Sequence, residues 1–388
     1  MSWGLGTLTK PLKILFLSTP VGPLGSGLGG GVELTVINLV QVMRAKGHQI
    51  DIAAPEGSSL PVAVHPPTAL IQIPGKWQPT AQTQDRLAPV TVSSALANAW
   101  VYAREHESKY DLLVNFAYDW LPFYLASFLK TPVAHFVSMG SLNDALDHAI
   151  AQTAVQFPGT LGAYTRSQVQ TFPMPERSWR LFGSAIDIRQ YDYCDRPEDT
   201  LAWIGRISPE KGLEDAIAAA DAAHQPLKIF GKLEDANYWQ RLQPLIHQAT
   251  VPIEYSGFLS TSALQKALGL CRALLVTPKW TEAFGMVAIE ALACGVPVIA
   301  YARGGLAEIV RNHQTGWLVS PDDVMDLVGA IAKIDQINRA DCRRQAECLY
   351  DLPAWGERFE QWFGQILSGT VSSGAVPSIV RPNNSTAS

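Results

Sequence analysis

The sequence is poor in several features that mark whole classes of proteins. Five cysteines occur among 388 residues, and they form neither a CxxC pair nor the spacing of a zinc site. Charged residues make up only 17% of the chain, the net charge is −5, and no stretch gathers five or more basic residues. Scattered cysteines are typical of reduced thiols in the cytosol, and a weakly acidic chain is a poor match for nucleic acid. We therefore expect a cytoplasmic protein that binds no nucleic acid and has no polybasic membrane anchor.

Two more absences concern membranes and metals. The apolar run 13–17 is far too short for a signal peptide or a membrane span, so we expect no integral membrane segment. The histidines lack metal-ligand spacing, and no Asp-x-Asp triplet occurs, which argues against a magnesium or manganese ion held by carboxylates. We expect neither a metal nor another cofactor.

Short apolar runs alternate with helical patterns along most of the chain, and the length suits two domains. Such alternation indicates βαβ units and parallel sheets, so the predicted fold class is α/β. The pattern restarts near residues 185–198, which predicts two Rossmann-like domains, 11–190 and 198–350, with a ligand crevice between them. The expected strands are 14–17, 49–53, 111–115, 133–137, 201–204, 227–230, 253–256, 273–276 and 297–300, and a covering helix is expected at 33–46.

Three further segments have a distinct composition. Residues 353–368 repeat aromatic and apolar side chains at helical spacing, which predicts a final amphipathic helix. Serine, glycine, proline and asparagine dominate 369–388, which predicts a disordered tail. The polar, irregular segment 74–92 is the expected mobile loop of the first domain.

The most informative segment is 277–300. Glu282 and Glu290 stand eight positions apart and bracket the Phe284-Gly285 step that opens an apolar helix, beginning near Met286. A helix N-terminus offers unpaired N–H groups and the positive end of a dipole, which suits a phosphate. The two carboxylates can hold hydroxyls on either side of a diphosphate, which is the layout of a sugar nucleotide.

Two other motifs fit a diphosphate. The glycine-rich stretch 22–33 follows a strand and includes Gly30 and Gly31, whose backbone can approach a phosphate closely. The stretch is equally compatible with a surface loop, and Glu33 with an acidic residue that stabilises the first turn of a helix. After a strand of the second half, Arg206 and Lys211 supply a planar fork and a point charge. Their alternative is a solvated turn with an ordinary ion pair.

Two motifs of the first half point to the other side of the crevice. His135 lies near the carboxyl end of an expected strand, where ligands bind in open α/β sheets, although a packed histidine is the simpler alternative. The stretch 115–122 crowds aromatic side chains around Asp119, for which a helix cap is the alternative. In the second half, Gly304-Gly305 with Glu308 is a further candidate for a phosphate or sugar contact.

Together these motifs resemble those of the retaining glycosyltransferases of family 4, which have the GT-B fold. The resemblance covers about residues 13–368 and rests on Gly30-Gly31-x-Glu33, on Arg206 with Lys211, and on the 282–308 block. Stretches 18–27, 115–122 and 276–280 more closely resemble cyanobacterial UDP-glucose:tetrahydrobiopterin glucosyltransferases. One departure is Ala283, where the family more often has proline.

The resemblance implies a role for each matched position. The final helix crosses back onto the first domain, as is usual in GT-B enzymes. Glu282 holds the transferred sugar, Glu290 the ribose, and Arg206 with Lys211 the diphosphate. The implied catalytic residues are His135, Arg206, Lys211 and Glu282, and the implied donor-binding residues are Gly30, Gly31, Arg206, Lys211, Glu282, Phe284, Gly285, Met286 and Glu290.

The acceptor is inferred from the same resemblance. A pterin presents an N3–H and a 2-amino group that a carboxylate accepts, and flat faces that stack on aromatic rings. The expected acceptor-binding residues are Glu33, Phe116, Tyr118, Asp119, Trp120 and His135, and Asp144 and Asp147 are rival carboxylates.

The resulting hypothesis is a metal-independent, retaining glycosyltransferase. It moves a hexose, glucose from UDP-glucose, to a hydroxyl of a reduced pterin such as tetrahydrobiopterin. The alternatives are another small-molecule, lipid or polysaccharide acceptor, an inactive sugar-nucleotide binder, and a phosphorylase that uses pyridoxal phosphate.

Overall fold

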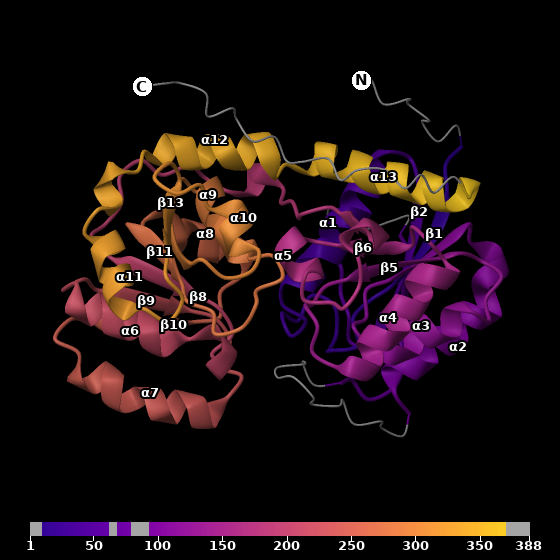
Figure 1. Cartoon of the computed structure of the whole chain (residues 1–388), viewed down its shortest axis with the longest axis horizontal. Helices are drawn as coiled ribbons and strands as arrows, with labels where there is room; N and C mark the ends of the chain where they lie inside the picture. Colours follow the sequence, from indigo (N-terminus) through magenta and orange to yellow (C-terminus); the bar gives the residue numbers. More distant parts are fainter. Residues whose placement is uncertain (1–9, 62–67, 79–92, 370–388) are drawn as a thin grey trace.

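The computed structural model describes residues 10–61, 68–78 and 93–369, which fold into two α/β halves that lie side by side (Figure 1). Each half is built on one parallel sheet. The strand order is β3-β2-β1-β4-β5-β6-β7 in the first sheet and β10-β9-β8-β11-β12-β13 in the second. The α/β class that the alternating pattern predicts is therefore confirmed.

All nine strands expected from the sequence are present, and β3, β6, β7 and β13 are additional. The first sheet consists of β1 (Lys13–Leu17), β2 (Gln49–Pro55), β3 (Leu70–Ile73), β4 (Leu112–Asn115), β5 (Val133–Val137), β6 (Leu161–Ala163) and β7 (Trp179–Leu181). The second consists of β8 (Leu201–Ile204), β9 (Leu227–Phe230), β10 (Ile253–Gly257), β11 (Ala273–Val276), β12 (Val298–Tyr301) and β13 (Gly316–Val319).

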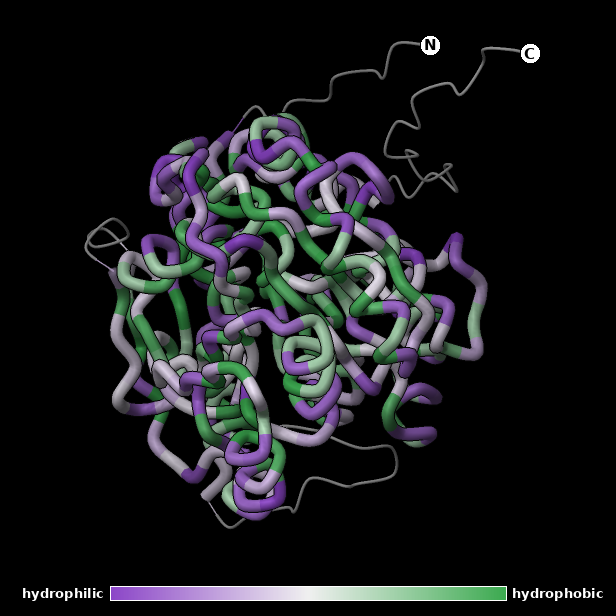
Figure 2. The backbone as a smooth tube through the Cα atoms, turned by 90° about the vertical axis from the view of Figure 1, so that its left-hand side faces the viewer, coloured by the Kyte–Doolittle hydropathy of each residue, from purple (hydrophilic) through white to green (hydrophobic). Residues whose placement is uncertain are grey.

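The central strands are buried and mostly apolar because helices cover both faces of each sheet. Every residue of β4, β5, β11 and β12 is buried. Apolar segments accordingly run through the interior of the fold, while polar segments dominate its outer turns (Figure 2).

The helices connect successive strands, as a parallel sheet requires. In the first half they are α1 (Gly31–Ala45), α2 (Ala95–His106), α3 (Trp120–Ala126), α4 (Asp144–Gln156) and α5 (Arg166–Val169). In the second half they are α6 (Leu213–Ala222), α7 (Ala236–Gln248), α8 (Thr261–Gly269), α9 (Met286–Ala293) and α10 (Leu306–Ile309). Helices α11 (Val324–Ile331) and α12 (Arg339–Leu349) follow the last strand, β13.

The last helix, α13 (Leu352–Ser368), leaves the second half and packs on the first (Figure 1). Phe359 stacks on Phe182 with ring centroids 4.1 Å apart, and the Glu360 carboxylate lies 2.8 Å from Lys46 Nζ. A Cβ on Gly356 would lie 2.3 Å from the Val42 side chain, so only glycine allows α13 to approach α1 this closely. The apolar face of this helix thus ties the end of the described chain to the first sheet.

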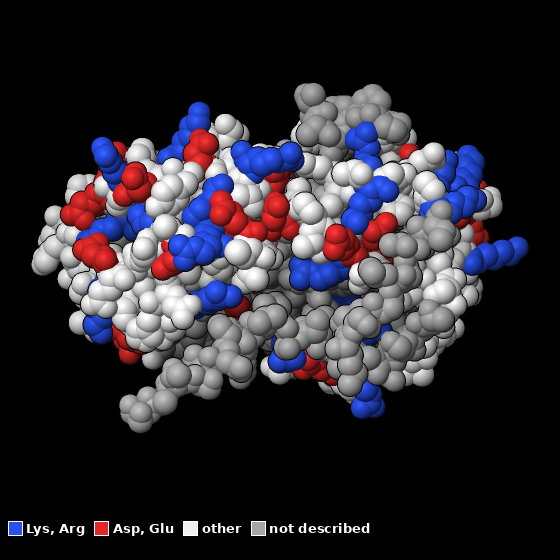
Figure 3. Space-filling view, turned by 90° about the horizontal axis from the view of Figure 1, so that it is seen from above, with Lys and Arg blue, Asp and Glu red and all other residues white. Residues whose placement is uncertain are grey.

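The surface of the face that carries α12 and α13 shows Lys and Arg interspersed with Asp and Glu (Figure 3). Residues 79–92 of the predicted mobile loop and 370–388 of the predicted tail lie outside the described residues. No helix among the described residues has both the length and the apolar character needed to cross a membrane.

Candidate active site

The topology places the predicted motifs at the switch points of the two sheets. In the first sheet, chain connections diverge between β1 and β4, which are followed by the glycine-rich loop and by the 116–119 segment. In the second sheet they diverge between β8 and β11, which are followed by the Arg206 turn and by the Glu282 segment. Ligands of open α/β sheets bind outside the carboxyl ends of such strand pairs.

Glu282 and Lys211 form the central ion pair of the second half. Lys211 Nζ lies 2.6 Å from Glu282 Oε2, and Trp280 Nε1 donates to the same oxygen at 3.2 Å. The ammonium group also lies over the Trp280 ring, 4.8 Å from its centroid. Burial alone would raise the pKa of Glu282, but the charges of Lys211 and Arg206 outweigh burial and lower it. Glu282 is therefore a carboxylate.

Two helix N-termini approach each other from opposite halves next to this pair. Helix α9 begins after Gly285, whose φ is 108°, and α1 begins after Gly30, whose φ is 61°. Neither terminus is capped by a side chain within the described part of the chain. A Cβ on Gly31 would lie 3.0 Å from Met286 Cγ, so the first turns of α1 and α9 meet. Two positive helix ends and uncapped N–H groups make this a place for an anion.

The second cation, Arg206, is held by two carboxylates. Its Nη1 donates to both oxygens of Glu234 at 3.0 Å, and its Nη2 lies 3.1 Å from Glu210 Oε1. Ser208 donates to the same Glu210 oxygen at 2.7 Å. A phosphate that binds Arg206 must therefore compete with, or displace, the Glu234 side chain.

Glu290 lies inside α9, one turn beyond the point where the two helices meet. Its carboxyl group is buried, and the Tyr191 hydroxyl donates to Oε1 at 2.9 Å. Burial raises the pKa of Glu290 to about 7, although the Tyr191 hydrogen bond opposes this shift. The group consequently gains or loses a proton near neutral pH.

Glu33, which is predicted to bind the acceptor, faces the glycine-rich loop of its own half. Its Oε2 accepts from the backbone N–H groups of Gly25 at 2.8 Å and Gly27 at 3.1 Å, and its Oε1 from that of Gly29 at 2.5 Å. The side chain is 5% exposed. Glu33 thus shapes the glycine loop from inside, a role that the spacing of an acid four residues after Gly29 could have suggested.

His135 and Phe116, which are predicted to contact ligands, are both buried in the structure. His135 is fully buried in β5 and stacks on Phe123 with ring centroids 4.5 Å apart. Burial lowers its pKa to about 3, so the ring is neutral. Phe116 is 1% exposed and packs between Phe16 and Phe136. Neither side chain can contact an acceptor without rearrangement, because neighbouring strands and helices cover it.

Asp119 caps the N-terminus of α3, which is the role that the sequence offers as the alternative to acceptor binding. Its Oδ1 accepts from Leu121 N at 2.9 Å at the start of α3, and its Oδ2 accepts from Gln78 Nε2 at 3.1 Å. Trp120 is 45% exposed and stacks on Tyr124 along the surface of α3. Tyr118 is turned inward, and its hydroxyl accepts from Leu142 N at 3.0 Å.

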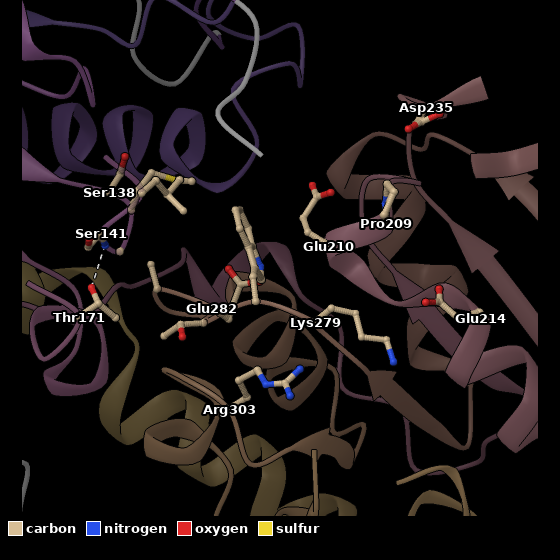
Figure 4. A pocket seen from close by; sticks show the side chains of 16 residues that line it. Ser138, Ser141, Thr171, Pro209, Glu210, Glu214, Asp235, Lys279, Glu282 and Arg303 are labelled. Carbon is tan, nitrogen blue, oxygen red and sulfur yellow. Dashed lines mark hydrogen bonds between the residues drawn. The ribbon is translucent and has the colours of Figure 1, made fainter. Parts of the chain in front are cut away.

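A cavity of about 960 Å³ lies between the two halves. Ser138, Ser141 and Thr171 stand on one side of it, Glu210, Lys279 and Arg303 on the other, with Glu282 between them (Figure 4). Its lining consists of Ser138, Met139, Gly140, Ser141, Leu142, Thr171, Pro209, Glu210, Glu214, Asp235, Lys279, Trp280, Thr281, Glu282, Ala283 and Arg303. The 138–142 loop and Thr171 are therefore the first half's contribution to the lining.

The rival carboxylates Asp144 and Asp147 differ in position. Asp144 is exposed in the first turn of α4. Asp147 is buried, 4% exposed, and accepts a hydrogen bond from Ser141 Oγ at 2.6 Å. Burial raises the pKa of Asp147, and the Ser141 hydrogen bond counteracts this.

Glu308 joins the two halves and is not a phosphate contact. Its Oε1 accepts from the backbone N–H and the hydroxyl of Ser167, both at 2.7 Å, at the start of α5. Gly304 packs against the backbone of Glu282 and Gly305 against that of Phe284, and Gly305 N donates to Glu282 O at 2.7 Å. The 304–308 segment thus supports the site without lining its anion-binding part.

No group of three or more His, Cys, Asp or Glu in the described ranges (10–61, 68–78 and 93–369) has the geometry of a metal site.

The decisive comparison concerns the second half. Residues 194–347 match the glycosyl transferases group 1 family. That match contains Arg206, Lys211, Glu282 and Glu290, and it includes no residue of the first sheet.

Known proteins resemble this chain over different lengths. A 160-residue segment is 32% identical to the glycogen synthase of Mycobacterium tuberculosis and covers 39% of this chain and 38% of that protein. A 375-residue alignment with the D-inositol 3-phosphate glycosyltransferase of Rhodococcus jostii is 26% identical and covers 84% and 82%. The chain thus spans less than two-fifths of the glycogen synthase that it matches.

Solved glycosyltransferase structures share the whole architecture. Anabaena HepE in complex with UDP and glucose superposes with a TM-score of 0.71 at 18% identity, over 91% of this chain and 100% of that one. The sucrose-phosphate synthase of Thermosynechococcus elongatus gives 0.72 at 19% identity, over 92% and 100%. The predicted GT-B fold is therefore confirmed.

Proposed function

We propose that this protein is a GT-B glycosyltransferase that moves a hexose from a nucleotide-sugar donor to a small acceptor. The observation that carries the proposal is the convergence of the α1 and α9 N-termini beside Lys211 and Glu282. A donor diphosphate fits between two positive helix ends, and the carboxylate beside it suits hydroxyls of the transferred sugar. The group 1 match over 194–347 supports the same assignment.

The proposed chemistry needs charge stabilisation more than a metal. Breaking the bond at the anomeric carbon builds positive charge on the sugar ring and negative charge on the leaving diphosphate. Lys211, Arg206 and the α9 amides are placed to stabilise the second charge. Arg206 becomes available when phosphate displaces Glu234. Glu290, with Tyr191 behind it, is the proposed holder of the ribose hydroxyls.

A retaining, front-face reaction follows from the resemblance to family 4. In that reaction the acceptor hydroxyl attacks on the side that the diphosphate leaves, and the departing phosphate oxygen takes its proton. His135 takes no part in this version, because its ring is buried away from the cavity. The carboxylate of Glu282 binds the sugar and is not a nucleophile.

UDP-glucose as donor and a reduced pterin as acceptor are the specific proposals. They rest on the resemblance of stretches 18–27, 115–122 and 276–280, and the cavity between the halves has room for a small bicyclic molecule. Relatives named for glycogen, 2-deoxystreptamine and inositol phosphate each match 37–39% of this chain, so these matches do not indicate the acceptor. Another small-molecule, lipid or polysaccharide acceptor is the alternative. The five free cysteines fit the proposed cytoplasmic location.

A product assay tests the proposal. UDP-, ADP- and GDP-glucose are each incubated with tetrahydrobiopterin, and both the pterin glycoside and the released nucleotide are quantified by mass spectrometry. We expect a glycoside from UDP-glucose without added metal and in the presence of EDTA. Nucleotide release without any pterin glycoside would contradict the pterin proposal and leave the glycosyltransferase proposal standing. Neither product from any donor would contradict both.

A further inference from the structure

The first-half wall of the cavity, the 138–142 loop, is held by polar side chains behind it, of which Gln168 and Asp147 are buried. Gln168 is fully buried, and its Nε2 donates to the carbonyl oxygens of Val137 and Met139, each at 2.8 Å. Thr171 Oγ1 accepts from Ser141 N at 2.8 Å (Figure 4). Surface loops usually bond to water instead, so a loop braced in this way is a preorganised surface.

Ser141 is the side chain that this brace presents to the cavity. Its hydroxyl donates to Asp147 Oδ2 at 2.6 Å, and Asp147 itself is 4% exposed. The other oxygen of Asp147, Oδ1, has no hydrogen-bond partner in the part of the chain that is described, so the carboxyl group is held for Ser141 alone. A hydroxyl group has one hydrogen, and in Ser141 this hydrogen is donated in the hydrogen bond to Asp147. Ser141 Oγ can therefore only accept a hydrogen bond from a molecule in the cavity.

Helix α5 fixes this wall relative to the Glu282 segment. Thr165, the N-cap of α5, donates from Oγ1 to Ala283 O at 2.8 Å, while Gln168 of the same helix holds Met139. Glu308 closes the N-terminus of α5 from the second half. Ser141 and Glu282 line the same cavity, and α5 links the two segments that carry them. A sugar bound at Glu282 and a molecule bound at Ser141 would therefore lie in one cavity.

We infer that the acceptor binds against the 138–142 loop, where Ser141 Oγ accepts a hydrogen bond from an N–H or O–H group of the acceptor. Asp147 is a positioning residue that keeps the Ser141 hydroxyl turned away from the cavity. The inference rests on the proposed function, because it presumes that a sugar is transferred at Glu282. The N3–H and 2-amino groups of a pterin are donors of the required kind.

The test compares tetrahydrobiopterin with its N3-methyl analogue as acceptors, for wild-type enzyme and three variants. We expect the wild type to favour the parent over the analogue by about 10- to 100-fold in kcat/KM, since an unmet polar group costs that much. Ser141→Ala should bring this preference close to one. Asp147→Asn should weaken it, because its amide lets the Ser141 hydroxyl point elsewhere. Glu105→Gln, at an exposed position of α2, is the control and should keep the preference.

Release of UDP without acceptor, measured in parallel, reports on the donor site, and thermal melting reports on folding. A Ser141→Ala enzyme that folds and still prefers the parent would overturn the inference. If the wild type releases UDP but makes no pterin glycoside, the pterin proposal fails and a second variant decides. Ser141→Trp fills the cavity wall, so it should abolish glucose transfer from UDP-[¹⁴C]glucose into an extract of small metabolites. Undiminished transfer by that variant would overturn the inference. Absence of both transfer and UDP release in the wild type would overturn the proposed function with it.

Discussion

The two halves share a parallel-sheet topology but use the carboxyl ends of their strands in opposite ways. In the second half, Arg206, Lys211 and Glu282 bring charged groups together at the edge of the sheet. In the first half, Glu33 and Asp119 turn inward and bond to backbone N–H groups. The charged side chains of the second half therefore face the candidate site, whereas the first half contributes uncharged groups that are held in a defined shape.

Under the proposed function, this difference would let one architecture serve several acceptors. The charged residues proposed to bind the donor lie in the region that matches the group 1 family. The shape of the first half depends on loops whose side chains hold each other in place, and such loops vary without disturbing the sheet. Each of the following experiments acts on one half and asks whether the other is affected.

The largest effect is expected when charge is removed from the second half. Lys211→Ala should lower kcat by about 1,000-fold, because one preorganised donor is worth 10²–10³ and Glu282 also loses its partner. The measurement is UDP release and transfer under saturating donor. Lys228→Ala, which removes a surface pair with Glu198, is the control and should stay within twofold. A loss confined to acceptor KM would contradict the division between the halves.

The second experiment changes the shape of the glycine-rich loop through Glu33, a side chain that bonds to the loop and not to a ligand. In Glu33→Gln, an amide N–H replaces one oxygen and faces the N–H groups of the glycine loop. Each unmet buried donor costs about 1–3 kcal/mol, so we expect a donor KM about tenfold higher and a lower Tm. Glu56→Gln, at an exposed position, is the control. A lower Tm with an unchanged donor KM would show that the loop does not contribute to the donor site.

The same contrast marks what could be predicted from sequence. The nine predicted strands have four or more residues. Of the four that were missed, β6 and β7 have three residues each, which is too short for a pattern, β13 begins with glycine, and β3 is interrupted by Gln72. Arg206 and Lys211 lie five positions apart in one short motif, so they can be recognised from the sequence alone. The bracing of Met139 by Gln168 joins residues 29 apart and depends on tertiary packing.

The orientations of His135, Glu33 and Asp119 also have a physical cause. His135 lies two residues before the end of β5, so the alternation of the strand points it into the layer covered by Phe123. Glu33 follows glycines and Asp119 precedes an aromatic residue, and an acid in such a place can either bind a ligand or bond to nearby backbone N–H groups. The sequence does not distinguish these two roles. Only the partners, the amides of Gly25 and Leu121 among them, distinguish a structural carboxylate from a binding one.

The third experiment uses pH to examine Glu290. Because burial raises its pKa to about 7, the folded protein holds a proton that the unfolded chain has lost between about pH 4.5 and 7. Its contribution to the free energy of unfolding is therefore present below about pH 4.5 and is lost as the pH rises through 7. Thermal melts of wild type and Glu290→Gln should diverge over this range.

Nucleotide binding should report the same group with the opposite sign. Ribose hydroxyls donate to an ionised carboxylate, so UDP affinity should rise through about pH 7 in the wild type. Calorimetry of Glu290→Gln should show weaker binding, by about tenfold, without that rise. The difference between the two proteins removes the titration of UDP itself. Parallel pH profiles would show that Glu290 does not contact the nucleotide.

The smallest effect is expected at Asp119, and it is the sharpest test of the comparison. Asn caps a helix as well as Asp does, so Asp119→Asn should change the free energy of unfolding by less than about 0.5 kcal/mol. If its two oxygens serve only Leu121 N and Gln78 Nε2, acceptor KM should stay within twofold, whereas Asp119→Ala should cost about 1 kcal/mol of stability. A tenfold rise in acceptor KM for Asp119→Asn at unchanged Tm would mean that Asp119 contacts the acceptor by charge. The first half would then recognise its ligand as the second does, and the contrast between them would be wrong.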